Sequence, residues 1–294
     1  QIYTLTHMNK QLTTSICSFF FCISLLSAQS LSSLKDIQPG SGNGVSSYGQ
    51  DYATAGSKIY FPGTDTGFPV GLFVSDGTAA GTKKAGTVSA ASPEMFLAAG
   101  ARVFFKAYGS SGDALFVTNS AASGAASIKT FSGPYLEGIL PFDNAKVLLA
   151  VNDETSNKPK QLWNSTTSAA SKVADLDLNP EYMVHSRFGN NSVFYERSTN
   201  FEQIEPFITN GTAAGTQKII DWIQPITPFA KVTAAYSTGD LMFLSGYTIS
   251  NGFQYSKRVA TDGTAAGTKE IDFFGDISRV IKRDSSSYFL IGNE

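Results

Sequence analysis

Short apolar segments recur along the chain at nearly equal intervals. Six of them combine β-branched, aromatic and leucine residues, at positions 59–61, 103–105, 147–149, 193–195, 241–243 and 288–290. Their first residues are 44, 44, 46, 48 and 47 positions apart. Short segments of this composition, separated by glycine-containing stretches, are typical of strands rather than helices. The steady interval predicts one structural unit that is used repeatedly.

A second pattern follows the apolar segments and has the same period. Three copies are nearly identical, SDGTAAGT at 75–82, TNGTAAGT at 209–216 and TDGTAAGT at 261–268, and two weaker copies lie at 115–124 and 162–171. Aligning the late glycine of each copy, or Ser171 where it is replaced, gives spacings of 43, 47, 44 and 52 residues. Two independent patterns therefore define the same unit.

Each unit reads as four strands. A weakly apolar stretch such as 95–99 comes first, then the strongly apolar segment, a strand that leads into the motif, and a fourth strand such as 217–221. Four short strands with their turns fill about 45 residues, which is the size of one propeller blade. The sequence therefore predicts an all-β fold, a β-propeller of four-stranded antiparallel blades.

The predicted blades cover residues 46–91, 92–134, 135–179, 180–226 and 227–276, with part of a sixth at 277–294. Residues 29–45 form a lead-in segment. Five blades and part of a sixth make an incomplete propeller, and an open ring leaves unpaired strand edges that natural proteins avoid. We therefore expect the chain to be a fragment of a longer protein.

The motif residues are predicted to be structural turn residues. Asp-Gly and Asn-Gly favour the positive φ that a turn between antiparallel strands needs, and the Asp or Asn side chain can accept a hydrogen bond from an amide two residues on. The threonine hydroxyl after each glycine can serve the same purpose. The residues concerned are Asp76, Gly77, Thr78, Asn210, Gly211, Thr212, Asp262, Gly263 and Thr264.

The alternative for these acidic positions is a calcium site. Calcium takes six to eight oxygen ligands, usually with several carboxylates. Each copy supplies one carboxylate at most, and Asn210 supplies an amide. The exchange of Asp for Asn fits a hydrogen-bond acceptor better than a metal ligand or a charged catalyst, so we expect neither a metal nor a cofactor.

The chain resembles a known repeat family. The segment LFVSDGTAAGT at 72–82 is similar to the ELWxxDGT repeat of bacterial secreted proteins, and Asp-Ile-Gln-Pro-Gly at 36–40 is similar to the D-I-x-P-G tail of its units. The resemblance covers about residues 36–294; only Glu205 matches the leading glutamate and only Trp163 the tryptophan. It implies an exported or surface-attached propeller scaffold without one assigned activity.

The N-terminal region predicts export. Met8 is the expected start, Lys10 gives a positive region, and residues 16–26 are an apolar run with small residues after it. This is typical of a signal peptide at 8–28, with residues 1–7 upstream of the true start. The alternative, a membrane anchor, would need about 20 apolar residues. The mature chain would then have no cysteine, because Cys17 and Cys22 lie in that run.

Few residues suggest catalysis. The mature chain would keep one histidine, His185, which argues against a Ser-His-Asp triad or a histidine zinc site. Net charge is −2 and no basic block occurs, so we expect no nucleic-acid partner. Acids that could form a catalytic pair are Asp113, Asp153, Glu196 and Glu202. We expect four aromatic residues to be exposed, so that they could stack on carbohydrate or contact a protein: Tyr135, Trp163, Trp222 and Tyr247.

These observations favour a non-catalytic, exported binding or adhesion scaffold with a protein or carbohydrate ligand. Two alternatives stay open: a carbohydrate-active propeller enzyme that uses a carboxylate pair, and a structural module of a larger exported protein. The units differ most at 152–160 and 247–256, and such unequal loops often mark the binding face of a repeat protein.

Overall fold

A computed structural model describes most of the chain beyond residue 33. The described residues are 34–39, 44–45, 52–65, 70–85, 91–109, 111–118, 124–153, 161–175, 183–196, 206–271, 277–282, 284 and 288–292. All of them belong to one unit, residues 34–294. The predicted signal peptide at 8–28 lies outside the described residues.

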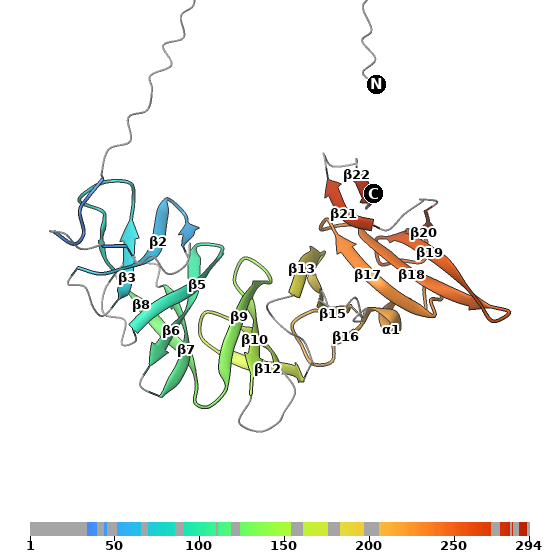
Figure 1. The fold of residues 1–294 in the computed structure, drawn as a ribbon, viewed down its shortest axis with the longest axis horizontal. Coiled ribbons are helices and arrows are strands. Elements are labelled where there is room, and N and C mark those ends of the chain that lie inside the picture. The colour runs from blue at the N-terminus through green and yellow to red at the C-terminus, as the bar shows by residue number, and fades with distance from the viewer. Residues whose placement is uncertain are drawn as a thin grey trace, which may run out of the picture. The chain divides into compact units, whose positions relative to one another are not determined.

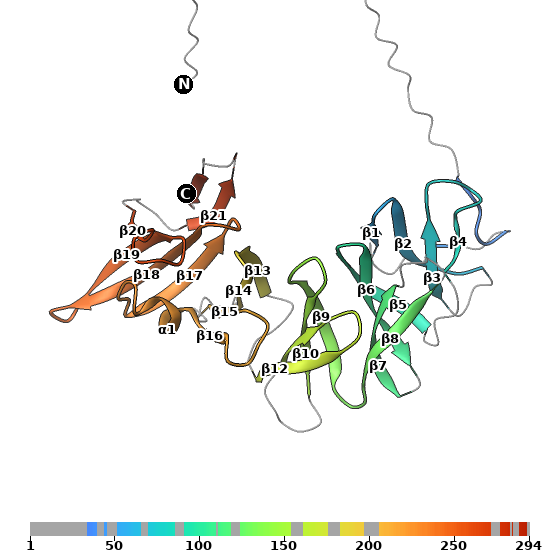
Figure 2. The same ribbon diagram turned by 180° about the vertical axis from the view of Figure 1, so that it is seen from behind.

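The described part of the chain folds into five four-stranded antiparallel sheets and one two-stranded sheet (Figures 1 and 2). In each four-stranded sheet the order of the strands in space is their order in the sequence. A simple four-stranded antiparallel meander is the topology of a propeller blade. The predicted fold class, all-β with four-stranded antiparallel blades of propeller type, is confirmed.

The strands of blades one to three are β1 (Ala53–Ala55), β2 (Lys58–Gly63), β3 (Gly71–Ser75), β4 (Lys83–Lys84), β5 (Ala91–Ala99), β6 (Arg102–Gly109), β7 (Gly112–Thr118), β8 (Ala125–Phe131), β9 (Tyr135–Pro141), β10 (Val147–Asn152), β11 (Gln161–Ser165) and β12 (Ala170–Asp175). Those of blades four and five are β13 (Met183–Phe188), β14 (Asn191–Glu196), β15 (Phe207–Thr209), β16 (Thr216–Lys218), β17 (Lys231–Ser237), β18 (Met242–Ser250), β19 (Phe253–Thr261) and β20 (Lys269–Glu270). The two-stranded sheet is β21 (Ile277–Lys282) with β22 (Tyr288–Gly292).

The core lies between neighbouring blades. Successive residues of a strand point to opposite faces of the sheet. Phe105 on β6 therefore packs with Tyr60 and Leu72 of the first blade, whereas the adjacent Phe104 packs with Leu136 and other residues of the third. Both phenylalanines are fully buried. Burying such a side chain contributes about 1.5–3 kcal/mol.

Burial on both faces explains the apolar pattern of the sequence. On β10, Leu149 packs toward the second blade and Leu148 toward Phe194 of the fourth. A strand that is covered on both faces has no polar side, so it reads as a continuous apolar run rather than as an alternation. The six apolar segments that set the period are therefore the second strands of their sheets.

The lead-in segment contacts the first blade. Lys35 Nζ donates a hydrogen bond of 2.7 Å to the carbonyl of Thr82, and the amide of Thr64 donates one of 2.9 Å to the carbonyl of Gly44. Val45 also forms an isolated bridge with Gly63, at the end of β2. The Thr82 carbonyl and the Thr64 amide, which lie just outside the strands of this blade, thereby gain hydrogen-bond partners.

A short helix replaces most of one predicted strand. The expected fourth strand at 217–221 is wrong beyond residue 218, because α1 (Ile219–Ile223) follows β16 directly. Ile219 and Ile223 lie one turn apart and are both buried in the cluster between the fourth and fifth blades. Pro225 then prevents the helix from continuing. This insertion accounts for part of the longest motif spacing, 52 residues; the rest lies between the apolar segment at 241–243 and the motif of the fifth blade.

Among the residues that the structure describes, no helix combines the length and the apolar character that a bilayer crossing requires.

Candidate functional site

The eight-residue motif forms the connection between the third and fourth strands of its blade. In the first blade, β3 ends at Ser75 and β4 begins at Lys83, so residues 76–82 make the loop. The corresponding segments are 210–215 and 262–268. The connection is thus longer than the tight turn expected from Asp-Gly alone, and the whole motif takes part in it.

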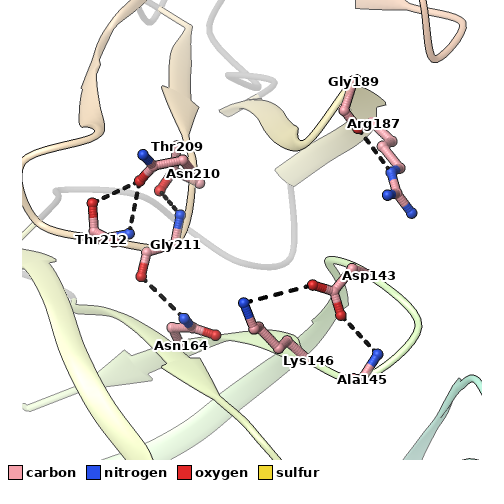
Figure 3. Close-up of polar contacts among 10 residues, drawn as sticks. All are labelled: Asp143, Ala145, Lys146, Asn164, Arg187, Gly189, Thr209, Asn210, Gly211 and Thr212. Atoms are coloured by element: carbon pink, nitrogen blue, oxygen red, sulfur yellow. Dashed lines mark hydrogen bonds and ion pairs between the residues drawn. The ribbon is translucent and has the colours of Figure 1, made fainter.

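The Asp or Asn side chain organises the start of each loop. In the fourth blade, Asn210 Oδ1 accepts hydrogen bonds from the Thr212 amide at 3.0 Å and from the Thr212 hydroxyl at 2.7 Å (Figure 3). Asp76 Oδ1 accepts the same two bonds from Thr78, at 2.9 and 2.7 Å. Asp262 accepts them from Thr264 at the same two distances. One side-chain oxygen accepts both hydrogen bonds in each loop, so Asn can replace Asp at this position.

The threonine after each glycine closes the loop. The hydroxyls of Thr78, Thr212 and Thr264 accept hydrogen bonds from the amides of Gly81, Gly215 and Gly267 at 2.9, 3.1 and 2.9 Å. Each hydroxyl therefore donates to the acidic or amide side chain and accepts from the far side of the loop. The geometry makes these threonines internal braces of the loop.

The two glycines of the motif are required for different reasons. Gly77, Gly211 and Gly263 have φ of 88°, 83° and 92°, a region that favours glycine. At the second glycine, a Cβ atom would collide with the side chain that organises the loop: at residue 81 it would lie 1.9 Å from Asp76 Oδ1. The same collision occurs between residues 215 and 210 and between 267 and 262.

A pair of hydroxyls fastens each loop to its sheet. Ser75 Oγ and Thr82 Oγ1 lie 2.7 Å apart, and the pairs Thr209–Thr216 and Thr261–Thr268 lie 2.6 Å apart. The first hydroxyl of each pair also accepts the amide of the positive-φ glycine. Ser75, Thr209 and Thr261 are buried, as are Thr118 and Ser165 at the same strand end of the other two blades. The role of this hydroxyl was not expected from the sequence, although a Ser or Thr stands at this position in all five copies.

In the fourth and fifth blades the loop also touches the preceding blade. Asn164 Nδ2 on β11 donates a hydrogen bond of 3.0 Å to the carbonyl of Gly211 (Figure 3). A Cβ on residue 211 would lie 3.2 Å from the ring of Phe142, and one on residue 263 would lie 3.5 Å from that of Phe188. A Cβ on Gly77, in contrast, would meet nothing within 4 Å. The fourth-blade loop is therefore hydrogen-bonded to the third blade, and the fifth-blade loop lies close to Phe188 of the fourth.

Hydrogen bonds within the motif loops lower the pKa of their two aspartates. The hydrogen bond from the Thr78 hydroxyl, and next that from the Thr78 amide, lower the pKa of Asp76, and Thr264 lowers the pKa of Asp262 in the same way. Both carboxylates are exposed. The described residues contain no group of three or more His, Cys, Asp or Glu side chains that could hold a metal ion. These loops therefore do not bring together the several carboxylates that a calcium site usually has.

The two weaker copies differ from each other. In the third blade, Ser165 Oγ donates to the carbonyls of Thr166 and Ala169, so a shorter connection keeps the hydroxyl brace. In the second blade, residues 119–123 of the copy lie outside the described residues. There Thr118 Oγ1 accepts the amide of Val103 at 3.0 Å, which ties the strand end to β6.

One candidate acid, Asp113, belongs to a polar cluster at the β6–β7 hairpin. Lys106 Nζ lies 3.0 Å from Asp113 Oδ2 and 3.1 Å from Glu94 Oε1. The Tyr108 hydroxyl donates to Glu94 Oε1 at 3.0 Å, and the ammonium also lies 4.7 Å from the centre of the Tyr108 ring. Asp113 in turn accepts the Leu136 amide of the next blade at 2.9 Å. Asp113 and Lys106 are almost completely buried.

The cluster shifts the pKa of its members. Burial lowers the pKa of Lys106, but hydrogen bonds to Asp113, Glu94 and Tyr108 outweigh it, and the pKa is raised. Burial raises the pKa of Tyr108. Glu94, Lys106 and Tyr108 were not singled out from the sequence, because nothing in one sequence shows that cross-strand pairing brings them together.

The other candidate acids do not join this cluster. Asp153 is buried just after β10 and has its own polar partner. The side chain of Glu196, all of Glu202 and the side chain of His185 lie outside the described residues. Among the described residues, Glu94 and Asp113 are therefore brought together, because both contact the ammonium nitrogen of Lys106.

The candidate aromatic residues differ in exposure. Tyr135 is exposed. Trp163 is half-buried, packs edge-to-face on Phe131 and donates from Nε1 to Gln161. Trp222 packs edge-to-face on Phe188 within the core between the fourth and fifth blades. Tyr247 is half-buried. The expectation of exposure is wrong for Trp163, Trp222 and Tyr247, which are half-buried; the two tryptophan rings fill space beside the core.

Apart from Leu34 and Val45 of the lead-in segment, the exposed large apolar residues in the described part of the chain lie at the opposite end of their blades from the motif loops. Tyr52, Tyr108, Tyr135, Ile249, Phe253 and Tyr255 are exposed. Each lies where the second strand passes to the third, or where the first strand begins, and antiparallel pairing puts these at one end of a blade. The unequal segment 247–256 was the sequence signal for three of them. The segment at 152–160 is described only to Asp153.

No family model and no curated protein matches the chain. Among solved structures, it is similar to the β-propeller domain of the Trilobed protease from Pyrococcus furiosus, with 11% identity, a TM-score of 0.42 and 83% of each chain covered. An oligogalacturonate lyase in complex with manganese has 10% identity and a TM-score of 0.46, over 81% of this chain and 68% of that one.

A puromycin-hydrolysing peptidase of Mycobacterium tuberculosis has 11% identity and a TM-score of 0.40, and covers 75% of this chain. This chain spans only 37% of that peptidase. Every one of these TM-scores is below 0.5, so none of these likenesses bears on activity. The propeller-type fold follows from the strand order and the packing of the blades themselves.

Proposed function

We propose that the chain is an exported, non-catalytic scaffold that binds a protein or carbohydrate ligand outside the cell or at the bacterial cell surface. Membership of the ELWxxDGT repeat family, suggested by the motif, is part of this proposal. The binding face would be the end of the blades opposite the motif loops.

The contrast between the two ends of the blades is the observation that carries the proposal. At one end, three near-identical loops use their polar side chains within the loop, as with Asn210 and Thr212. At the other end the connections differ between blades and exposed aromatic residues such as Tyr108 and Phe253 gather. Repeated loops that satisfy their own polar groups are typical of a structural framework. Variable connections with exposed aromatic residues are typical of a recognition surface.

The polar cluster supports a non-catalytic role over a glycoside hydrolase. A hydrolase needs open space between its two carboxyl groups for a glycosidic oxygen or a water molecule. Between Glu94 and Asp113 that space holds the ammonium of Lys106, which contacts both. Asp113 is moreover engaged with the backbone of the next blade. This arrangement is suited to stabilising the interface between the second and third blades.

Binding and hydrolysis can be tested together on the full chain. We expect glycan or protein arrays to give at least one reproducible ligand, and we expect no bond cleavage when that ligand is incubated with the protein. Absence of any ligand on both arrays would count against the binding role. Cleavage that is lost in Asp113→Asn and Glu94→Gln would favour the enzyme instead.

Export requires its own experiment. Expression of the full chain in a bacterium, followed by fractionation and N-terminal sequencing, should yield a protein outside the cytoplasm that begins at Gln29. Retention in the cytoplasm with an intact N-terminus would contradict the exported part of the proposal and leave the binding part unaffected.

A further inference from the structure

The β18–β19 hairpin extends beyond the rest of its own sheet (Figure 1). The two strands pair from Met242–Thr261 to Ser250–Phe253, whereas β17 reaches only as far as Tyr247. On the other side, β20 pairs only with Val259 and Ala260. Among the described residues, no third strand pairs with residues 248–255, which form a two-stranded ribbon. Asn251 and Gly252, with φ of 51° and 80°, form its two-residue turn.

The ribbon presents two aromatic side chains on one face. Phe253 pairs with Ser250 and Tyr255 pairs with Thr248, so all four side chains lie on the same side. Phe253 is 69% exposed and Tyr255 is 52% exposed. Residues two apart on a strand are separated by about 7 Å. Each ring can therefore receive its own unit of a chain-like ligand.

The opposite face of the ribbon is different. Ile249 pairs with Gln254 there, and Ile249 is also exposed, by 58%. Tyr247, which pairs with Ser256 at the base of the ribbon, lies on this face as well but is half-buried. Within residues 248–255, the exposed side chains of this face are those of Ile249 and Gln254, without an aromatic ring.

The ribbon carries no charge. The segment 247–256 contains no Asp, Glu, Lys, Arg or His. The nearest cation along β19, Lys257, is paired at 2.7 Å with Glu270 and lies over the ring of Phe229. Apart from the Ile249 side chain, the exposed groups are aromatic rings, hydroxyls and amides. Such a surface complements an uncharged ligand and offers no cationic partner to a phosphate, a sulfate or an acidic peptide.

Exposing two aromatic rings on a ribbon without a core of its own forgoes the stabilisation that burial would give them. Exposed apolar groups of this kind mark interaction sites. A sugar ring offers both contacts that the face needs. Its C–H groups meet the negative face of an aromatic ring, and its hydroxyls can bond to Ser250 and Thr248 beside the rings.

We propose that Phe253 and Tyr255 form a carbohydrate-binding site for an uncharged oligosaccharide or polysaccharide, with Thr248 and Ser250 bonding to the sugar hydroxyls. This inference rests on the proposed binding function and names the ligand class. The site lies at the variable end of the fifth blade. A membrane or a generic apolar partner would use Ile249 as much as the two rings.

The test uses the full chain and neutral polysaccharides, namely soluble cellulose derivatives, xylan, mannan and starch, in affinity electrophoresis, followed by calorimetry with the matching hexasaccharides. For whichever polysaccharide retards the protein, Phe253→Ala and Tyr255→Ala should each weaken binding about ten-fold or more. Ile249→Ala is the matched control and should change affinity by no more than about two-fold. Circular dichroism and the urea midpoint check that all three variants are folded.

Four outcomes would overturn the inference. Wild-type affinity in both aromatic variants would remove the rings from the site, and an equal loss in Ile249→Ala would indicate an unspecific apolar contact. Retardation by none of the neutral polysaccharides, with a protein ligand found on the arrays, would refute the sugar ligand and leave the proposed function intact. No ligand of either class would count against both.

Discussion

The Leu136 amide on β9 donates a hydrogen bond of 2.9 Å to Oδ2 of Asp113, which lies on β7 of the preceding blade. The same oxygen receives the ammonium of Lys106 at 3.0 Å. One buried carboxylate therefore satisfies a side chain of its own blade and a backbone group of the next. This contact therefore helps to specify how the second and third blades meet.

Loss of this carboxylate should destabilise the protein strongly. Asp113→Ala leaves the Lys106 ammonium with fewer partners and the Leu136 amide without its acceptor, which should cost about 3–5 kcal/mol. Asp113→Asn keeps an acceptor and should cost less. Urea unfolding followed by fluorescence measures both. The control is Asp175→Ala, which breaks the exposed pair with Lys172 and should cost about 0–1 kcal/mol; equal losses at the two sites would contradict the role given to Asp113.

The second glycine of the motif should be intolerant of any side chain as long as the acid is present. Gly81→Ala places a Cβ against Asp76 and should cost about 1–3 kcal/mol. Asp76→Ala removes the obstructing group, so the double variant should be more stable than the sum of the two single losses predicts. Strictly additive losses in urea titrations would show that the two side chains do not compete for the same space.

Contact with the preceding blade can be separated from backbone strain by comparing two equivalent glycines. Gly77→Ala, with φ of 88° and open space, should cost only the strain of the left-handed conformation, about 1–2 kcal/mol. Gly211→Ala carries the same strain and also places a Cβ 2.9 Å from Asn164 Nδ2. It should cost about 1–3 kcal/mol more.

The explanation can be checked by relieving the contact. Asn164→Ala in the Gly211→Ala background should recover part of the loss, because it removes the atom that the new Cβ approaches. The same change in the Gly77→Ala background should bring no such recovery. A recovery in both backgrounds would mean that the contact between blades is not the cause.

The motif acids should make stability depend on pH on the acid side. Their pKa is lowered from 3.8 in the folded protein by hydrogen bonds from Thr78 and Thr264. The contribution is therefore present above about pH 4 and is lost as the pH falls through the folded value. Asp76→Asn with Asp262→Asn should leave stability near pH 7 nearly unchanged and flatten the decline below pH 4. Midpoints of thermal unfolding between pH 2.5 and 7 measure this; a decline as steep as in the wild type would contradict it.

The repeat and the strand type could be predicted from the sequence because both depend on local composition. Strands such as β6 and β10 are buried on both faces, so each becomes a conspicuous apolar run. The acceptor role of Asp76 could be inferred from its replacement by Asn210, since only one oxygen is used. These are properties that a residue shows through its neighbours in sequence.

Features that depend on pairing across strands could not be predicted. The cluster of Glu94, Lys106 and Asp113 forms because three strands of one sheet bring distant positions side by side. Ile219 and Ile223 suit a strand by composition, and their helix is favoured by burial between two blades. Phe253 is exposed and Trp163 is half-buried because the two strand pairs extend to different lengths. A periodic sequence pattern does not show how far each strand pair extends.

The closed hydrogen-bond network of the motif loop has a consequence for how such a chain can grow. A duplicated stretch of gene that encodes Ser/Thr-Asp-Gly-Thr-Ala-Ala-Gly-Thr brings every donor and acceptor that this corner needs, so a new copy does not depend on matching mutations elsewhere. Selection can then reshape the distant ends of the strands in each copy separately. The addition of whole blades and the divergence of the loops at their opposite ends can therefore evolve independently.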